Sequence, residues 1–122
     1  MSDASDDRTV NLILPTPPSA NIYWRTDRRG FAYLSDEAKA YKIDIAKIAE
    51  LPALIYSEIA ITVKFFRAQR SGDLDNRLKC LFDAMQKVVY ENDSQIVEIH
   101  AFRLEDKFRP RVEVEIRVLG LC

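Results

Sequence analysis

The alternation of apolar and charged residues near the C-terminus limits the fold of this chain more than any other feature. Residues 112–118 are apolar at every second position and charged between, which is the period of a strand with one buried and one solvated face. Residues 59–65 also alternate, with isoleucine, valine and phenylalanine at every second position. A sheet that is wet on one face buries the other against a second layer, so the pattern predicts an α+β fold.

Two amphipathic segments are predicted to form that second layer. The first helix begins after Ser35 as its N-cap, has Asp36 and Glu37 in its first turn, and runs to about residue 51. The second helix begins near residues 73–75, and its apolar residues recur at helical spacing. They are Leu78, Leu81, Phe82, Met85, Val88 and Val89.

The remaining segments complete a β-α-β-α-β-β order. Strands are predicted at residues 10–14 and 95–104. Residues 15–21 contain three prolines, which remove backbone donors and fix φ, so this segment is predicted to be irregular. Residues 28–30 form a loop or a hairpin tip. The order indicates a small α+β domain in which two main helices pack on a mixed sheet.

Length and composition bound the organisation of the chain. Its 122 residues fit one domain, predicted over residues 9–120 after a disordered acidic tail over residues 1–8. No apolar run approaches the ~20 residues of a membrane-spanning helix, and no secretory signal is apparent, so a reducing cytoplasm is expected. With three glycines the chain has no phosphate-cradling loop, and no organic cofactor is expected. Cys80 and Cys122 have no disulfide-framework or metal-ligand spacing.

Carboxylates gather around the second predicted helix. Asp73 and Asp75 stand at its start, Asp93 follows its end, and Lys79 lies one turn in. Carboxylates held near one another repel, and a hard divalent cation such as Mg²⁺ relieves that repulsion with oxygen ligands. Aspartates also cap helices and form turns. From spacing alone the metal site and the structural interpretation carry about equal weight.

Further polar residues lie close to this set. Asn76 adds a third short polar side chain beside the two aspartates. Asp83 lies four residues after Lys79, so it either continues the same helical stripe or forms an ion pair with Lys79 or Lys87. His100 is the single histidine and falls inside a predicted strand. We interpret it as a structural or surface residue and not as a catalytic base.

The cations are clustered although the net charge is −1. Five of them lie between residues 64 and 79, and these include Arg67, Arg70 and Arg77. A second cluster contains Arg25, Arg28 and Arg29. Local basic patches bind phosphate even near zero net charge, although such arginines are also common on ordinary surfaces. The adjacent Tyr23 and Trp24 either stack on nucleic acid or pack against the core, and the packing interpretation is favoured for Trp24.

Three motifs occur in one order along the chain. They are LPTPPSANIY at residues 14–23, DLDNRLKCLFDA at residues 73–84 and NDSQIV at residues 92–97. In these motifs and their spacing, from about residue 11 to 118, the chain resembles the RusA family of Holliday junction resolvases. The resemblance implies a small α+β homodimer, often prophage-encoded. Such proteins use Mg²⁺ or Mn²⁺ to hydrolyse phosphodiesters symmetrically at four-way DNA junctions.

The resemblance also implies a role for each matching residue. Asp73, Asp75 and Asp93 would be the metal ligands, and Lys79 would complete the catalytic set. Asn76 and Asp83 would support the site. Contacts to DNA would come from Asn21, Arg25, Arg67, Arg70 and Arg77.

The chain departs from the family pattern at three places. Ser71 and Gly72 interrupt the basic run before Asp73, Asn92 stands where an acidic residue often precedes the third aspartate, and Ala20 replaces the first asparagine of the N-terminal motif. These changes spare the proposed metal ligands and bear on DNA affinity. Two other functions remain open, a non-cutting module that binds branched DNA and a structural protein whose aspartates are caps.

A dimer interface is expected from the apolar residues of strand 95–104. Cys80 lies off the apolar stripe of its helix, so it is predicted to be exposed or at a subunit contact.

Overall fold

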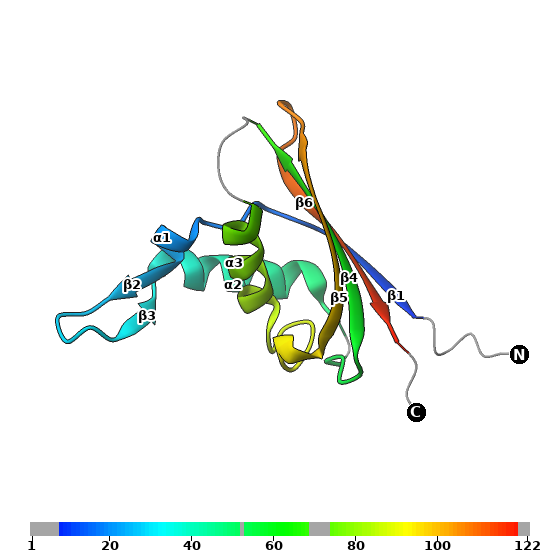
Figure 1. Cartoon of the computed structure of the whole chain (residues 1–122), viewed down its shortest axis with the longest axis horizontal. Helices are drawn as coiled ribbons and strands as arrows, with labels where there is room; N and C mark the ends of the chain where they lie inside the picture. Colours follow the sequence, from blue (N-terminus) through cyan, green and yellow to red (C-terminus); the bar gives the residue numbers. More distant parts are fainter. Residues whose placement is uncertain (1–7, 52, 69–73, 120–122) are drawn as a thin grey trace, which may run out of the picture.

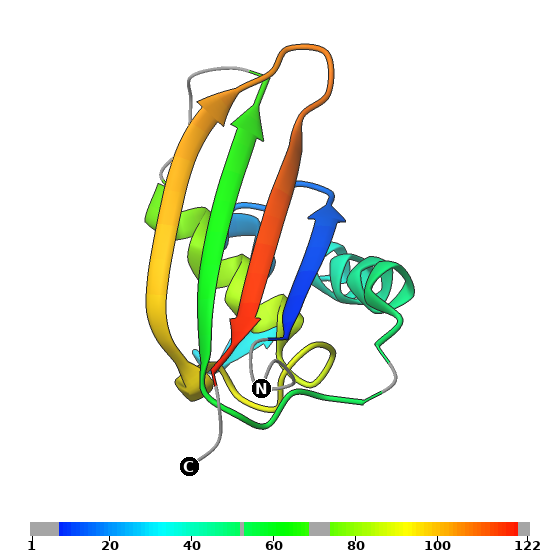
Figure 2. The same cartoon turned by 90° about the vertical axis from the view of Figure 1, so that its right-hand side faces the viewer.

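The centre of the molecule is a four-stranded mixed sheet. The computed structural model describes residues 8–51, 53–68 and 74–119. Across the sheet the order is β1 (Thr9–Leu14), β6 (Arg111–Val118), β4 (Ile59–Arg67) and β5 (Ile96–Glu105) (Figure 2). β6 is antiparallel to both β1 and β4, whereas β4 and β5 are parallel. β1 and β5 are therefore the two edges.

The sequence alternation determines which face of the sheet is buried. In β4 and β6 the apolar residues are buried, among them Ile61, Val63 and Ile116, and the charged residues point to the other face. Two helices, α2 (Asp36–Ala49) and α3 (Leu74–Met85), lie on the same side of the sheet (Figure 1). The side chain of Ser35 accepts a hydrogen bond from the backbone N–H of Ala38 at 3.1 Å, so α2 begins with the predicted cap.

The parallel pairing of β4 and β5 determines where the two ends of α3 lie. Parallel neighbours need a crossover, because the chain must return to the starting end before the second strand begins. α3 makes most of that return (Figure 1). Its N-terminus is therefore toward the end of β4. Its C-terminus is toward the start of β5, where the short 3₁₀ helix η2 (Asp93–Gln95) also lies.

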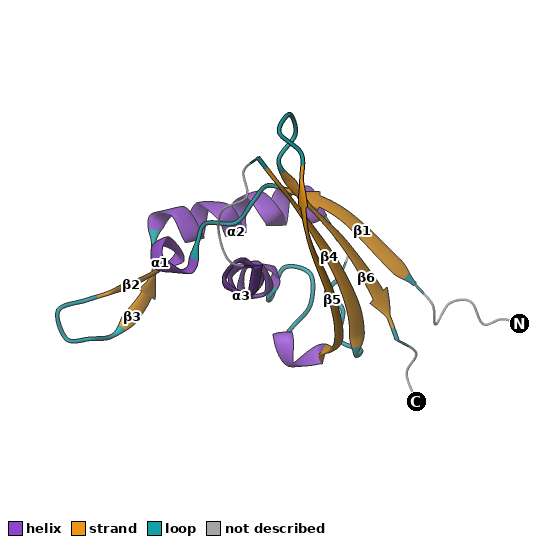
Figure 3. Ribbon diagram, turned by 45° about the horizontal axis from the view of Figure 1, so that its top comes forward, coloured by secondary structure: helices purple, strands orange, loops and turns teal. Residues whose placement is uncertain are grey.

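A two-stranded hairpin projects from the helical layer (Figure 3). β2 (Trp24–Thr26) follows directly from the short helix α1 (Ala20–Tyr23) and pairs antiparallel with β3 (Ala32–Leu34). The backbone N–H of Gly30 donates to the carbonyl of Asp27 at 3.0 Å, and Gly30 has a φ of 91°, a value that favours glycine in such turns. Backbone N–H groups of Phe31 and Arg29 donate to the Asp27 carboxylate and hold its pKa below the usual value.

The structure confirms the α+β class and the main element order, and it corrects several boundaries. α1 occupies the end of the segment predicted to be irregular, because the prolines stop at residue 18 and a helical turn can follow. α3 ends at Met85, since Lys87 adopts a φ of 64° that no α-helix accommodates, so Val88 and Val89 lie beyond the helix. β5 begins at Ile96 because the preceding three residues form η2.

Cys80 is fully buried, so the prediction of an exposed or subunit-contact position is wrong. α1 and α2 both pack against α3, in addition to the sheet, and they enclose a residue that lies off its main apolar stripe. Burial raises the pKa of the Cys80 thiol to about 11.

Some predictions fall outside the described residues. They concern the acidic tail up to residue 7 and the side chains of Arg70, Asp73 and Cys122. Among the described helices, none is both long and apolar enough to span a membrane.

Candidate active site on α3

A polar stripe runs along α3. Asp75, Lys79 and Asp83 follow one another at intervals of four residues, so they lie on one side of the helix. Asp75 and Lys79 are exposed and Asp83 is half-buried. The Asp75 carboxylate accepts a hydrogen bond from the backbone N–H of Asn76 at 2.9 Å, which partly satisfies the open donors of the first helical turn. Its other oxygen lone pairs face solvent and can accept a ligand.

Lys79 is held against an aromatic ring from the N-terminal third of the chain. Its Nζ lies 5.2 Å from the centroid of the Trp24 ring, within the range of a cation–π contact. Trp24 in turn meets Tyr23 in an edge-on arrangement, with centroids 4.6 Å apart. Trp24 is half-buried against the core, as the packing interpretation predicted, and its contact with Lys79 adds a positioning role.

Asp83 is tied to Tyr23 rather than to a lysine. The Tyr23 hydroxyl donates to Asp83 Oδ2 at 2.6 Å, and Lys42 Nζ donates to the backbone carbonyl of Asp83 at 2.9 Å. Burial raises the pKa of Tyr23, and the hydrogen bond to Asp83 raises it further, so the phenol stays a donor. Lys87 pairs with Glu91 at 2.7 Å. Asp83 thus links α3 to α1 and α2.

Asp93 stands at the start of η2 in a rigid turn. Asn92 and Gln95 form a capping box around it, with bonds of 2.9 and 2.8 Å to backbone N–H groups. Gln95 Nε2 also donates to the carbonyls of Ile55 and Ser57, both at 2.8 Å. The backbone N–H of Asp93 donates to Gln86 Oε1 at 2.9 Å, while its carboxylate is exposed. The turn therefore presents this carboxylate at the C-terminal end of α3.

Within one chain, the structure does not bring Asp75 and Asp93 together. Asp75 is in the first turn of α3, and Gln86, the partner of Asp93, follows its last residue. Among the described residues no three histidine, cysteine, aspartate or glutamate side chains lie close enough to hold a metal ion. The donors are hard oxygens of the kind that Mg²⁺ prefers, and Asp73, the third predicted ligand, lies outside the described residues.

The candidate DNA-contacting residues occupy three places. Arg77 turns toward the proline-rich segment, where its Nη1 donates to the carbonyl of Pro17. Asn21 on α1 and Arg25 on β2 are exposed. Arg67 ends β4, with Nε bonded to the carbonyl of Leu104 at 3.4 Å and Nη2 3.9 Å from Glu105 Oε2. Arg77 therefore holds a loop in place, which the sequence did not indicate.

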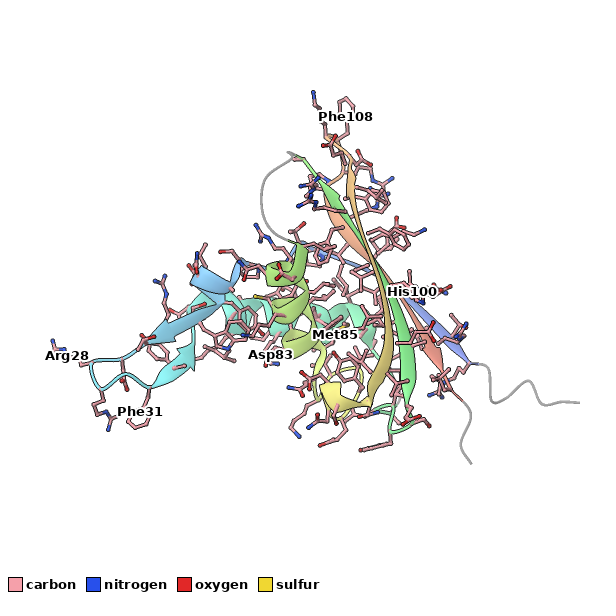
Figure 4. The ribbon with its side chains drawn as sticks, in the orientation of Figure 1. Arg28, Phe31, Asp83, Met85, His100 and Phe108 are labelled. Carbon is pink, nitrogen blue, oxygen red and sulfur yellow. The ribbon has the colours of Figure 1, made fainter. Side chains whose placement is uncertain are left out.

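The β2–β3 hairpin carries a cluster of exposed cations. Arg25, Arg28 and Arg29 are all exposed, and so are the rings of Phe31 (64%) and Tyr33 (52%). The Arg29 guanidinium lies 5.3 Å from the Phe31 ring centroid. Arg28 and Phe31 point outward at the tip (Figure 4). This surface can offer both charge and a flat apolar face to a ligand.

His100 lies apart from these residues on β5 (Figure 4). It is an exposed side chain whose Nε2 is 2.6 Å from Glu98 Oε2, which lowers the pKa of that carboxyl. It is a surface residue, as predicted.

Comparison with known proteins identifies the family. A family profile described as Endodeoxyribonuclease RusA matches residues 15–117. The chain belongs to the RusA family. This RusA-family chain is 32% identical over 118 residues to the crossover junction endodeoxyribonuclease RusA of Escherichia coli (strain K12), covering 92% of this chain and 97% of that protein.

Phage proteins with the same description are also similar. The protein of Enterobacteria phage 82 is 31% identical over 118 residues, with 92% of this chain and 97% of that protein covered. The protein of Enterobacteria phage HK97 is 36% identical over 98 residues, covering 75% and 80%. The RusA match spans the hairpin, α3 and η2, so it includes every described element of the candidate site.

Proposed function

We propose that this RusA-family protein is an endonuclease that hydrolyses phosphodiester bonds at four-way DNA junctions. The family match across residues 15–117 carries the proposal. The relatives are named crossover junction endodeoxyribonucleases. The exposed carboxylates of Asp75 and Asp93 and the positioned ammonium of Lys79 are the side chains that such chemistry requires.

A divalent cation, Mg²⁺ with Mn²⁺ as a substitute, is proposed to complete the site. Asp73, Asp75 and Asp93 would hold it through carboxylate oxygens, with Asn76 as a neighbouring polar group. When bound, such an ion neutralises phosphate charge and lowers the pKa of a coordinated water.

Lys79 is proposed to stabilise negative charge that develops on the phosphate or on the leaving oxygen. Its ammonium is one helical turn from Asp75, and the Trp24 ring limits where it can point. Asp83 is a positioning residue, because its bond to Tyr23 fixes the α1–β2 segment that carries Trp24.

The DNA backbone is proposed to run across α1 and the hairpin. Asn21 and Arg25 are exposed there, and Arg67 and Arg70 would extend the basic surface from the end of β4. A four-way junction has two-fold symmetry, so a homodimer with two sites matches paired cuts in two strands. A role in the resolution of DNA junctions also agrees with a cytoplasmic location.

The test is cleavage of a labelled four-way junction beside a linear duplex of the same sequence, in Mg²⁺, Mn²⁺ or EDTA. Wild type is expected to give paired symmetric nicks only with metal, and Asp75→Asn is expected to give none while its circular dichroism spectrum is unchanged. Nicking by Asp75→Asn at the wild-type rate would contradict the assigned role. Tight junction binding without nicks in either metal would instead identify a non-cutting module.

A further inference from the structure

The turn between β5 and β6 carries the most exposed aromatic ring among the described residues. Phe108 is 93% exposed, and its two neighbours Lys107 and Arg109 are exposed as well. Neither of these cations has an ion pair with another described residue. Phe108 points away from the body at the tip of the molecule (Figure 4). The candidate active site uses none of these three side chains.

This turn crosses over the end of β4. β5 and β6 lie on either side of β4, so the segment that joins them spans two strand spacings, roughly 10 Å. The backbone N–H of Asp106 donates to the carbonyl of Arg67, the last residue of β4, at 2.8 Å. The first turn of α3, which contains Asp75, also lies toward the end of β4. The exposed ring is therefore at the same end of the molecule as Asp75 (Figure 1).

Hydrogen bonds hold the turn in one shape. Asp106 Oδ1 accepts from the backbone N–H groups of Phe108 and Arg109, both at 3.1 Å. Asp106 Oδ2 accepts from Arg111 Nη1 at 2.8 Å, and this bond is the largest cause that lowers the pKa of Asp106. Pro110 fixes its own φ directly after the turn. The backbone that carries the exposed ring is thus positioned before any ligand binds.

Arg111 stabilises this turn, and its charge is already paired. Its guanidinium lies 3.9 Å from the centroid of the Phe66 ring, and its Nε donates to Glu113 Oε2 at 2.9 Å. Because Arg111 also pairs with Asp106, the carboxylate of the turn is neutralised. The charges of Lys107 and Arg109 therefore remain to attract an anionic ligand.

The combination of groups fits nucleic acid. An exposed aromatic ring stacks on the face of a base, and adjacent cations bind the phosphates beside it. A single exposed apolar side chain is common on protein surfaces and needs no explanation by itself. Here, however, the ring is fixed on a braced turn between two unpaired cations, at the end of β4 where the proposed basic surface already includes Arg67.

We propose that the β5–β6 turn is a second DNA-contacting element, which recognises the branch point of the junction. Phe108 stacks on a base pair that has lost a stacking neighbour where the arms meet, and Lys107 and Arg109 bind the flanking phosphates. A linear duplex keeps its internal base pairs stacked on both sides, so the ring contributes little to duplex binding. The inference rests on the proposed function for the identity of the substrate.

Binding in EDTA tests the stack independently of cleavage. Fluorescence anisotropy measures the affinity of wild type and Phe108→Ala for a labelled four-way junction and for a linear duplex of the same sequence. Phe108→Ala is expected to bind the junction about 5- to 150-fold more weakly, the loss expected for one base–aromatic stack, and the duplex within about twofold of wild type. Equal junction affinity of the two proteins would overturn the proposal.

Two further substitutions at the same position separate stacking from general apolar contact. Phe108→Trp keeps a flat ring and should retain junction affinity, and its added indole emission should be quenched when the junction binds. Phe108→Leu keeps apolar volume without a flat face and should remain weak. Wild-type junction affinity in Phe108→Leu would contradict a stack. Phe102→Ala, at a 46% exposed phenylalanine of β5, is the matched control and should bind as wild type does.

The two cations are tested through the salt dependence of junction binding. The double variant Lys107→Gln, Arg109→Gln should lower the slope of log K against log salt by up to about 1.8. The matched control is Lys39→Gln, Lys47→Gln, at two exposed lysines of α2, which should leave the slope unchanged. A wild-type slope in the first variant would reject the phosphate contacts of the turn.

Nicking in Mg²⁺ is recorded separately, so that the proposed function and the role of the turn can fail independently. A wild type that nicks junctions while Phe108→Ala keeps full junction affinity would reject the turn alone. A selective loss of junction binding in Phe108→Ala, with a wild type that cuts no junction, would support the turn and reject the function. If sedimentation velocity shows that Phe108→Ala is a smaller species than wild type, Phe108 is a subunit contact and the proposal is overturned.

Discussion

At the scale of single residues, contacts from distant segments define the candidate site. Lys79 is exposed, yet its ammonium lies over Trp24 of β2, a contact worth about 0.5–1 kcal/mol at such a position. That ring is itself held by Tyr23, whose hydroxyl bonds Asp83 on the next turn of α3. The successive contacts from Asp83 through Tyr23 to Trp24 therefore orient Lys79, which remains exposed.

Replacing Lys79 by glutamine is expected to lower the rate of junction cleavage by about 100-fold or more, because a charge that stabilises the transition state is lost. Junction affinity and melting temperature should stay near wild type, since the side chain is exposed. Single-turnover cleavage and a gel-shift titration measure the two effects. A Lys79→Gln rate within about threefold of wild type would show that Lys79 takes no part in the chemistry.

Cys80 gives a prediction about reactivity. The thiol is buried and its pKa is about 11, so at pH 8 few molecules carry the reactive thiolate. In a Cys122→Ser variant, native protein is expected to react with a maleimide far more slowly than protein in guanidinium chloride. Mass spectrometry follows the labelling. Equal rates in the two states would mean that α1 and α2 do not enclose Cys80.

At the scale of elements, the β2–β3 hairpin and α3 both contribute residues to the candidate site. The base of the hairpin packs beside Lys79, while its tip carries cations and Phe31 away from the body (Figure 4). The two residue steps of β2 from Trp24 to Thr26 rise roughly 7 Å, and the turn that carries Arg28 lies beyond them. The hairpin is therefore long enough to contact phosphates beyond those at the cleavage site.

Removing the positive charges of the hairpin is expected to weaken junction binding and to reduce the salt dependence of that binding. The variant Arg25→Gln, Arg28→Gln, Arg29→Gln removes three exposed charges, so the slope of log K against log salt should fall by up to about 2.7. Fluorescence anisotropy at several salt concentrations measures the slope.

The matched control removes three exposed cations elsewhere, Lys39 and Lys47 of α2 and Arg117 of β6. This variant should keep a slope close to wild type. If the slope falls equally in the two triple variants, the hairpin has no special contact with DNA.

At the scale of the whole molecule, three buried tyrosines join separate parts of the chain. Tyr23 bonds Asp83 of α3, Tyr41 of α2 donates to the carbonyl of Pro15 at 2.7 Å, and Tyr90 donates to the carbonyl of Phe82 at 2.7 Å. Burial is the largest cause that raises the pKa of each phenol. All three must be protonated in the folded protein.

This arrangement predicts loss of stability in alkali. The folded-state pKa of each tyrosine is raised, so its contribution is fully present below the unfolded value of about 10 and is lost as pH rises above it. At pH 11 each tyrosine favours unfolding by about 1.4 kcal/mol, and the three together by about 4 kcal/mol. Urea denaturation at pH 8 and pH 11 measures the difference. A Tyr41→Phe variant should lose about 1.4 kcal/mol less than wild type over this range, and a wild-type free energy of unfolding that is constant to pH 11 would contradict the prediction.

The local pattern of the sequence was enough to predict most elements. Period-two alternation in residues 59–65 and 112–118 and the Ser35 cap depend on contacts within a few residues, so they predicted β4, β6 and α2 correctly. The ends of α3 and β5 were less well predicted. They depend on the φ of Lys87 and on the capping box at Asn92, which compete with helix and strand periodicity.

The sequence by itself determined the α+β class, the helical stripe of Asp75, Lys79 and Asp83, and membership of a nuclease family, because these depend on spacing along the chain. Only the tertiary structure decided that Cys80 is enclosed, that Tyr23 holds Asp83, and that Trp24 holds Lys79. Only it showed how the turn of Asp93 is held, because the bonds of Gln95 to the carbonyls of Ile55 and Ser57 join segments that are 40 and 38 residues apart in the chain.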